Sequence, residues 1–141
     1  MDEVLNKIVS FIDKHHVMSL ASMGENGLSA CNLFYAFDEK ELSFVVASSD
    51  ETQHIQNILK NPKIAGTIVL ETKTVGKIQG LQFNGTFTLL QERTLKKLYF
   101  KTFPYVLAMN PKLWKIQVDH FKLTDNTLGF GKKLLYKPSK Q

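Results

Sequence analysis

Arginine is nearly absent from this sequence. Arg93 is the only arginine among the 18 basic residues, and all the others are lysines. Proteins that read nucleic-acid phosphates and bases rely on the bidentate arginine fork, so this composition argues against nucleic acid as a partner despite the net charge of +5. The lysines are spread along the chain up to a final cluster at Lys132, Lys133, Lys137 and Lys140. We interpret the charge as a solvated basic surface.

Cysteine and long apolar runs are also scarce. Cys31 is the single cysteine, which excludes an intramolecular disulfide and fits a reducing compartment. No apolar run reaches the roughly 18 residues of a membrane-spanning helix. The acidic start Met1-Asp2-Glu3 lacks the basic-then-apolar order of a signal peptide. We therefore expect one cytoplasmic domain over residues 1–137, with no membrane partner and a disordered tail at 138–141.

Motifs for metal binding or nucleophilic catalysis are missing as well. The histidines have no HExxH or His-x-His spacing, and a lone cysteine cannot form CxxC. No serine lies in a G-x-S-x-G elbow. Cys31 alternates with apolar neighbours, which is typical of a buried structural cysteine. We therefore expect no metal site and assign no catalytic residue.

The periodicity of apolar residues predicts a mainly β fold with flanking helices. Helices are expected over residues 2–14, from a cap at 48–50 to Asn61-Pro62, and over 91–103, with Asp50 and Gln53 forming a capping box. Strands are expected over residues 17–23, 28–37, 42–47, 63–70, 74–90, 113–123 and 134–136. Gly76, Gly80 and Gly85 interrupt the longest strand, and such glycines provide the bends that close a small barrel. The pattern thus indicates an antiparallel barrel with helices outside.

One segment is a candidate anion site. At residues 47–54 a strand ends and a helix begins, and backbone N–H groups at a helix N-terminus attract anions. Thr52 adds a hydroxyl, Gln53 an amide and His54 an imidazole. Many helices begin with such residues only as caps, so capping remains the alternative interpretation.

Three stretches resemble a known family. They are "FVVASSDETQHIQNILKNPKIAGTI" at 44–68, "QGLQFNGTF" at 79–87 and "LTDNTLGFGKK" at 123–133. The chain resembles the FMN-binding split-barrel superfamily, which is pyridoxamine-phosphate-oxidase-like, and within it the YhbP-like group. The resemblance implies a six-stranded antiparallel split β-barrel with Greek-key-like order. It also implies a homodimer with FMN at the interface and a flavin-dependent oxidoreductase of unknown substrate.

The same resemblance implies which residues hold FMN. The ring would lie along the backbone of Asn32, Leu33 and Phe34. The full implied set is Asn32, Leu33, Phe34, Ala47, Ser48, Thr52, Gln53, His54, Gln82, Trp114, Lys132 and Lys133. Within it, Ala47 and Ser48 lie near the ribityl phosphate, Gln82 faces the ring and Trp114 packs at its edge. Many members have arginine and lysine where this chain has Gln53 and His54, so Lys132 or Lys133 is expected to help hold the phosphate.

Two other functions remain open. The first is haem binding or haem degradation on the same barrel, with an iron ligand among His15, His16, His54 and His120. The second is a non-catalytic dimeric binding module with a basic surface. Oxidation of pyridoxamine phosphate itself is not expected, because the arginine and histidine pattern of those oxidases' substrate site is not matched.

Overall fold

The computed structural model describes residues 2–138. Its helices are α1 (Glu3–Asp13), α2 (Gln53–Lys60) and α3 (Arg93–Thr102), with short 3₁₀ turns η1 (Val75–Lys77), η2 (Pro104–Met109) and η3 (Asn126–Leu128). The strands are β1 (Val17–Gly24), β2 (Gly27–Phe34), β3 (Ala36–Asp38), β4 (Ser43–Ala47), β5 (Lys63–Leu70), β6 (Gln79–Leu89), β7 (Leu113–Asp125) and β8 (Lys133–Tyr136). None of the described helices has the length and apolar character needed to cross a membrane. The expected tail lies outside the described residues apart from residue 138.

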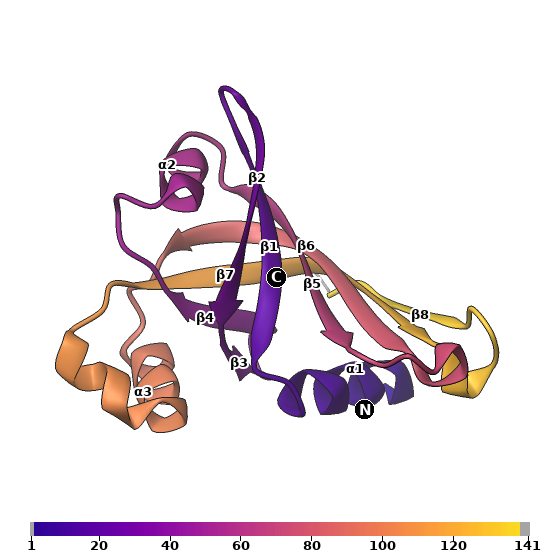
Figure 1. Cartoon of the computed structure of the whole chain (residues 1–141). Coiled ribbons are helices and arrows are strands. Elements are labelled where there is room, and N and C mark those ends of the chain that lie inside the picture. Colours follow the sequence, from indigo (N-terminus) through magenta and orange to yellow (C-terminus); the bar gives the residue numbers. More distant parts are fainter. Residues whose placement is uncertain (1, 139–141) are drawn as a thin grey trace.

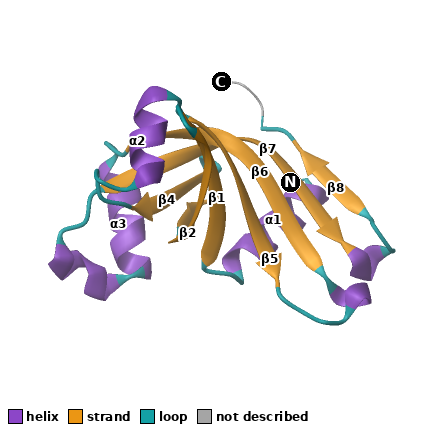
Figure 2. Cartoon of the chain, turned by 45° about the horizontal axis from the view of Figure 1, so that its top comes forward, coloured by secondary structure: helices purple, strands orange, loops and turns teal. Residues whose placement is uncertain are grey.

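The strands form one curled antiparallel sheet (Figures 1 and 2). Its order is β2-β1-β5-β6-β7-β4-β3, and β8 pairs with β7. Over residues 2–138 this sheet has eight strands. The predicted mainly β split barrel with flanking helices is confirmed, and the strand count of six is corrected to eight.

The extra strands arise partly because the segment expected as one strand at 28–37 is two. β2 pairs with β1, whereas β3 pairs with β4 at the other end of the sheet order. Tyr35 lies between them, is 3% exposed, and donates its hydroxyl to the carbonyl of Ile12 at 2.6 Å. The change of pairing partner at this buried anchor ends one strand and starts the next.

The strand expected at 74–90 also begins later, because residues 75–77 form the turn η1. Of the glycines in that segment, Gly85 lies at a register shift between β6 and β7. A Cβ on Gly85 would lie 2.5 Å from the carbonyl oxygen of Gln117, whereas a Cβ on Gly80 would meet nothing within 4 Å. Of the three glycines in this segment, only Gly85 must be a glycine, because the backbone of β7 lies too close for a side chain.

Two helices begin with side-chain caps. Asp2 accepts the amide of Val4 at 2.8 Å, and Thr52 accepts the amide of Ile55 at 3.4 Å. The cap of α2 is thus Thr52, so the predicted capping box of Asp50 and Gln53 is wrong. The helix ends at Lys60, before Asn61-Pro62, as the proline predicted.

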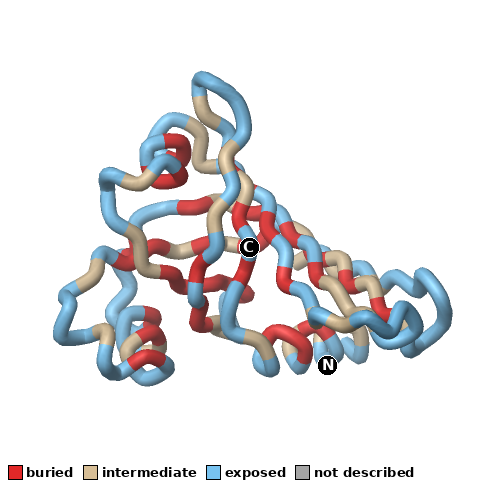
Figure 3. Tube along the Cα trace, in the orientation of Figure 1, coloured by how far each residue is buried: buried red, intermediate tan, exposed pale blue. Residues whose placement is uncertain are grey.

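The core fills the inside of the curled sheet (Figure 3). Alternating residues of each strand point inward, and α1 covers the core with Ile8, Phe11 and Ile12. Burial of each such side chain contributes about 1.5–3 kcal/mol. A second cluster forms where α3 packs on the other side of β4, through Leu95, Tyr99 and other residues. β4 is therefore buried on both faces.

The opposite face of the sheet carries small and polar side chains, and we call it the outer face. Ser19 of β1 lies opposite Asn32 of β2 and Thr67 of β5, and Thr67 lies opposite Gln82 of β6, which lies opposite Lys122 of β7. A neighbouring cross-strand row consists of Ala30, Ala21, Ala65, Asn84 and His120. Small and polar side chains thus occupy the middle of this face, while exposed apolar side chains such as Val17, Phe34 and Val69 lie toward the ends of its strands.

Candidate functional site

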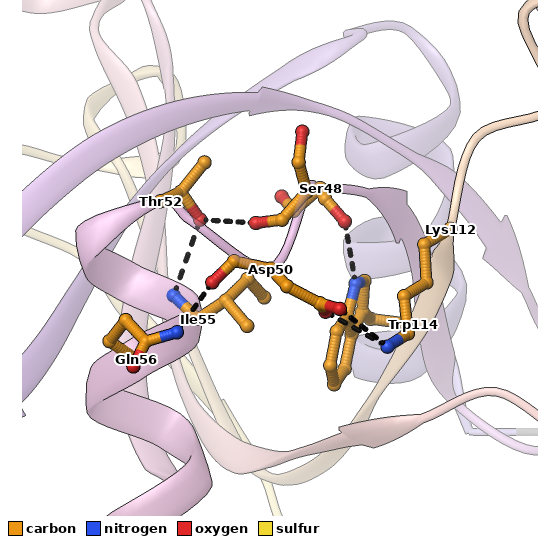
Figure 4. A network of polar contacts seen from close by, with 8 residues as sticks. Ser48, Asp50, Thr52, Ile55, Gln56, Lys112 and Trp114 are labelled. Carbon is orange, nitrogen blue, oxygen red and sulfur yellow. Dashed lines mark hydrogen bonds and ion pairs between the residues drawn. The ribbon is translucent and has the colours of Figure 1, made fainter.

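The loop after β4, residues 48–52, is fixed to β7 by its first residue. The amide of Ser48 donates to the carbonyl of Lys112 at 3.1 Å, and Nε1 of Trp114 donates to the carbonyl of Ser48 at 2.9 Å (Figure 4). Trp114 is 1% exposed. Its ring is therefore covered by the protein in this chain, and its indole N–H holds the carbonyl of Ser48.

The middle of the loop is held by two further contacts. Nζ of Lys112 lies 2.9 and 3.0 Å from the carboxylate oxygens of Asp50, and Nε2 of Gln56 donates to the Asp50 carbonyl at 2.7 Å (Figure 4). Thr52 donates its hydroxyl to the carbonyl of Ser49 at 2.9 Å. Residues 48–52 are thus held in one arrangement by β7, α2 and their own cap.

His54 points into the protein rather than toward solvent. It is 9% exposed, and its Nε2 lies 2.7 Å from Oγ of Ser48 and 3.5 Å from Oγ1 of Thr52. Burial lowers the pKa of this imidazole. His54 is therefore neutral at pH 7, and the segment offers an anion hydroxyl groups and helix N–H groups rather than a fixed cation.

Gln53 lies at the start of α2 and lines a groove beside it. Its Nε2 donates to Oδ1 of Asn57 at 2.8 Å, and Nδ2 of Asn57 donates to Oγ of Ser22 at 3.1 Å. Asn57 is 4% exposed, and the sequence prediction missed it. Glutamine and asparagine four residues apart on one helix are the signal that could have indicated this amide pair.

The segment expected to contact a flavin ring lies on an open strand edge. β2 pairs with β1, and no other described strand pairs with its second edge. The amide of Tyr35 bonds to His16 on the β1 side. Because hydrogen-bonding direction alternates along an antiparallel strand, the backbone groups of Asn32 and Phe34 point toward the open edge. Leu33 is 9% exposed and belongs to the core, and by the same alternation its backbone groups point to β1, so it offers no group to a ligand at the open edge.

The open edge and the loop are linked by packing. The ring of Phe34 contacts the ring of Phe103 edge-on, with centroids 5.8 Å apart. Phe103 belongs to the cluster under α3, against which Ala47 packs at the end of β4. The structure therefore brings the predicted residues 32–34 and 47–54 to one region of the chain.

Three predicted residues lie elsewhere in the chain. Lys133 pairs with Thr124, ten residues along β7 from Trp114, which corresponds to about 33 Å of strand length. Lys132 precedes it and donates its amide to Gly129 in the turn before β8. Gln82 lies on the outer face opposite Lys122. One chain therefore does not unite Gln82, Lys132 and Lys133 with the loop.

The remaining histidines do not gather into a site. His15 is partly buried against Phe11, with ring centroids 4.4 Å apart, His16 is exposed, and His120 lies on the outer face. Across residues 2–138 no three histidine, cysteine, aspartate or glutamate side chains are grouped as metal ligands. Burial raises the pKa of the Cys31 thiol, so this cysteine is not a ready thiolate.

Comparisons with known proteins identify the family. A pyridoxamine 5'-phosphate oxidase family model matches residues 4–119. UPF0306 protein YhbP of Escherichia coli is 37% identical, and the match covers 95% of this chain and 98% of that protein.

Two solved structures share the fold. A haem-binding protein from Mycobacterium smegmatis is 14% identical with a TM-score of 0.78, over 97% of this chain and 59% of that one. An FAD-binding protein from Mesorhizobium loti is 12% identical with a TM-score of 0.67, over 84% and 90%. Together with its UPF0306 relatives, this chain belongs to the pyridoxamine 5'-phosphate oxidase family of split barrels.

Proposed function

We propose that this protein binds a phosphorylated flavin, with FMN as the expected form, along the open edge of β2. The proposal rests on one observation: the open edge of β2 lies next to the fixed loop at residues 48–52. The two are linked through the contact between the rings of Phe34 and Phe103. The Mesorhizobium loti protein of the same fold, which is described as FAD-binding, supports a flavin as the ligand class.

The residues present suit the parts of a flavin. Backbone N–H and C=O groups of Asn32 and Phe34 would hold the polar rim of the ring. The Ser48 hydroxyl and the first amides of α2 would face the phosphate, while Thr52 keeps its hydroxyl bonded to Ser49 and caps the helix. When bound, a flavin supplies hydride transfer, while the protein supplies position and electrostatics. We therefore assign the protein as a flavin-dependent oxidoreductase whose substrate is not defined by these residues.

The proposal includes a homodimer. Of the two candidate cations at the loop, Lys112 is paired with Asp50, and burial lowers the pKa of His54. Lys132 and Lys133 lie at the other end of β7, about 33 Å along the strand, so we propose that they reach the phosphate from a second copy. The outer face of the sheet is the surface on which we place that copy.

Fluorescence titration with FMN and riboflavin tests the function. FMN is expected to bind at tens of micromolar or tighter, on the order of −6 kcal/mol, and more tightly than riboflavin. The double variant Lys132→Gln, Lys133→Gln should weaken FMN and leave riboflavin unchanged. Lys96→Gln, Lys97→Gln on α3 removes the same charge elsewhere and should change neither. Absence of any flavin binding would refute the function, and an equal loss for both flavins would remove these lysines from the phosphate site.

Haem is the second candidate, because the Mycobacterium smegmatis protein of this fold is described as haem-binding. His54 already uses its Nε2 with Ser48, which leaves His15, His16 and His120 as the better iron ligands. Addition of haem should then give a Soret band that shifts when the ligand histidine is changed to alanine. A Soret band that no histidine substitution shifts would exclude axial ligation by these residues.

A further inference from the structure

A groove lies between the tip of the β1–β2 hairpin and α2. Its volume is about 460 Å³, within the range of small-molecule sites. Met23 and Leu28 form an apolar part of its lining, while Ser29, Gln53 and Gln56 add neutral polar groups. Of the residues that line this groove, only Gln53 belongs to the proposed flavin site.

The width of the groove is fixed by the structure. Asn57 is 4% exposed and bonds through its side chain to both Gln53 and Ser22, so it ties the helix to the hairpin. A Cβ on Gly24 would lie 2.3 Å from Oδ1 of Asn57, which shows how closely hairpin and helix approach at this point. These contacts therefore fix the distance between the hairpin and α2 at this side of the groove.

The groove carries no net charge, and its polar groups are amides and a hydroxyl. Lys60 at one end is paired with Glu25. Gln53 and Gln56 each use their Nε2 within the protein, and across residues 2–138 no hydrogen bond engages their Oε1 atoms. Amide groups beside an apolar wall suit a neutral heteroaromatic base such as adenine, which presents an amino donor and ring-nitrogen acceptors.

The groove continues directly from the proposed flavin site. Ser29 in the groove and Asn32 on the open edge are three residues apart on β2, about 10 Å. Gln53 in the groove follows Thr52, the N-cap of α2, so it adjoins the helix amides at which we place the phosphate. A ligand that lies along β2 with phosphate at the start of α2 can therefore extend into the groove.

We propose that the groove holds the adenosine half of a flavin dinucleotide, so that FAD is preferred over FMN. This inference rests on the proposed flavin function and changes its expected form from FMN to FAD.

Titrations with FAD and FMN, compared in three proteins, test the proposal. The wild type should bind FAD at least about tenfold more tightly than FMN, equivalent to about 1.4 kcal/mol. Leu28→Trp, which fills the groove, should remove this preference by weakening FAD while FMN binding stays within about twofold. Leu59→Trp is the matched control, because Leu59 is an exposed leucine of α2 outside the groove, and it should keep the preference.

The outcomes separate the two proposals. Equal affinity for FAD and FMN in the wild type, or a preference for FAD that survives Leu28→Trp, would overturn the adenosine site while leaving flavin binding intact. Failure of both flavins to bind the wild type would overturn the flavin function and the groove together. A preference lost in Leu28→Trp and kept in Leu59→Trp would support the groove.

Discussion

Oγ of Ser48 lies 2.7 Å from Nε2 of His54, and the pair joins the end of β4 to the first turn of α2. The histidine is 9% exposed, so its imidazole acts as a neutral hydrogen-bonding group within the fold. The position that could have supplied a charge for a phosphate instead holds the loop in place. Affinity for a phosphorylated ligand must therefore come from hydroxyls, helix amides and groups outside this segment.

The buried histidine predicts a pH dependence of stability. The pKa of His54 in the folded protein is lowered by burial, while in the unfolded chain it is about 6.5. The unfolded state therefore takes up the proton first as pH falls, and stability is lost below about pH 6.5. Urea unfolding at about pH 7.5 and about pH 5.5 should show this loss in the wild type and a smaller one in His54→Gln. His16→Gln, an exposed control, should behave as the wild type, and an equal loss in all three would contradict the role of His54.

The hydrogen bond from the Trp114 indole to Ser48 predicts a loss of both stability and flavin affinity when it is removed. Trp114→Phe removes the donor to the Ser48 carbonyl, and an unsatisfied buried carbonyl costs about 1–3 kcal/mol. Unfolding free energy should fall by about that amount, and flavin affinity should weaken because the loop loses its anchor. Lys112→Met removes the ion pair with Asp50 and the contact of Nζ with the Trp114 ring, both near the surface, and should cost no more than about 1 kcal/mol. Equal effects of the two variants would show that the indole bond does not hold the loop.

The two glycines of β6 should respond differently to substitution by alanine. In Gly85→Ala the new Cβ would press on the carbonyl of Gln117, and such overpacking costs about 1–3 kcal/mol. Gly80→Ala adds its Cβ to open space and should change the unfolding free energy by less than about 0.5 kcal/mol. Chemical denaturation of both variants measures the difference, and similar midpoints would contradict the close approach at Gly85.

The outer face predicts the assembly state. If a second copy covers this face, Ala65→Arg places a large charged side chain in the middle of it, because Ala65 lies between Ala21 and Asn84. Sedimentation velocity should show a dimer for the wild type and a folded monomer for the variant. A wild type that stays monomeric at tens of micromolar, on the order of weak association, would refute the dimer.

Local pattern was enough to predict most elements of the fold. The apolar spacing in α1 and the proline after Asn61 predicted two helices within a few residues. The break at Tyr35 was not predictable in this way, because residues on both sides of it have the pattern of a strand. Which neighbour each half pairs with is decided by β1 and β4, which are separated in the sequence and brought into position only by the folded sheet.

The roles of the candidate residues stay predictions, and their geometry was predictable only in part. Residues 47–54 were identified as one segment, and they do lie together beside the open edge of β2. The inward orientation of His54 depends on Ser48 and on the aromatic core around Phe87, which no local spacing reports. The position of Lys132 at the other end of the sheet follows from the length of β7, whereas the family resemblance implied only that Lys132 or Lys133 helps hold the phosphate.

The proposed flavin site depends on the open edge of β2, and substitution of Asn32 tests this edge directly. Asn32→Pro removes a backbone N–H that points away from β1, so the ladder between β1 and β2 is kept while the edge loses a donor. Asn32→Ala keeps that N–H and removes only the side chain. Titration with FMN, followed by flavin fluorescence and with circular dichroism confirming the fold, should show binding by the wild type and Asn32→Ala and at least about tenfold weaker binding by Asn32→Pro. Equal FMN affinity in a folded Asn32→Pro would contradict a flavin held by this strand edge.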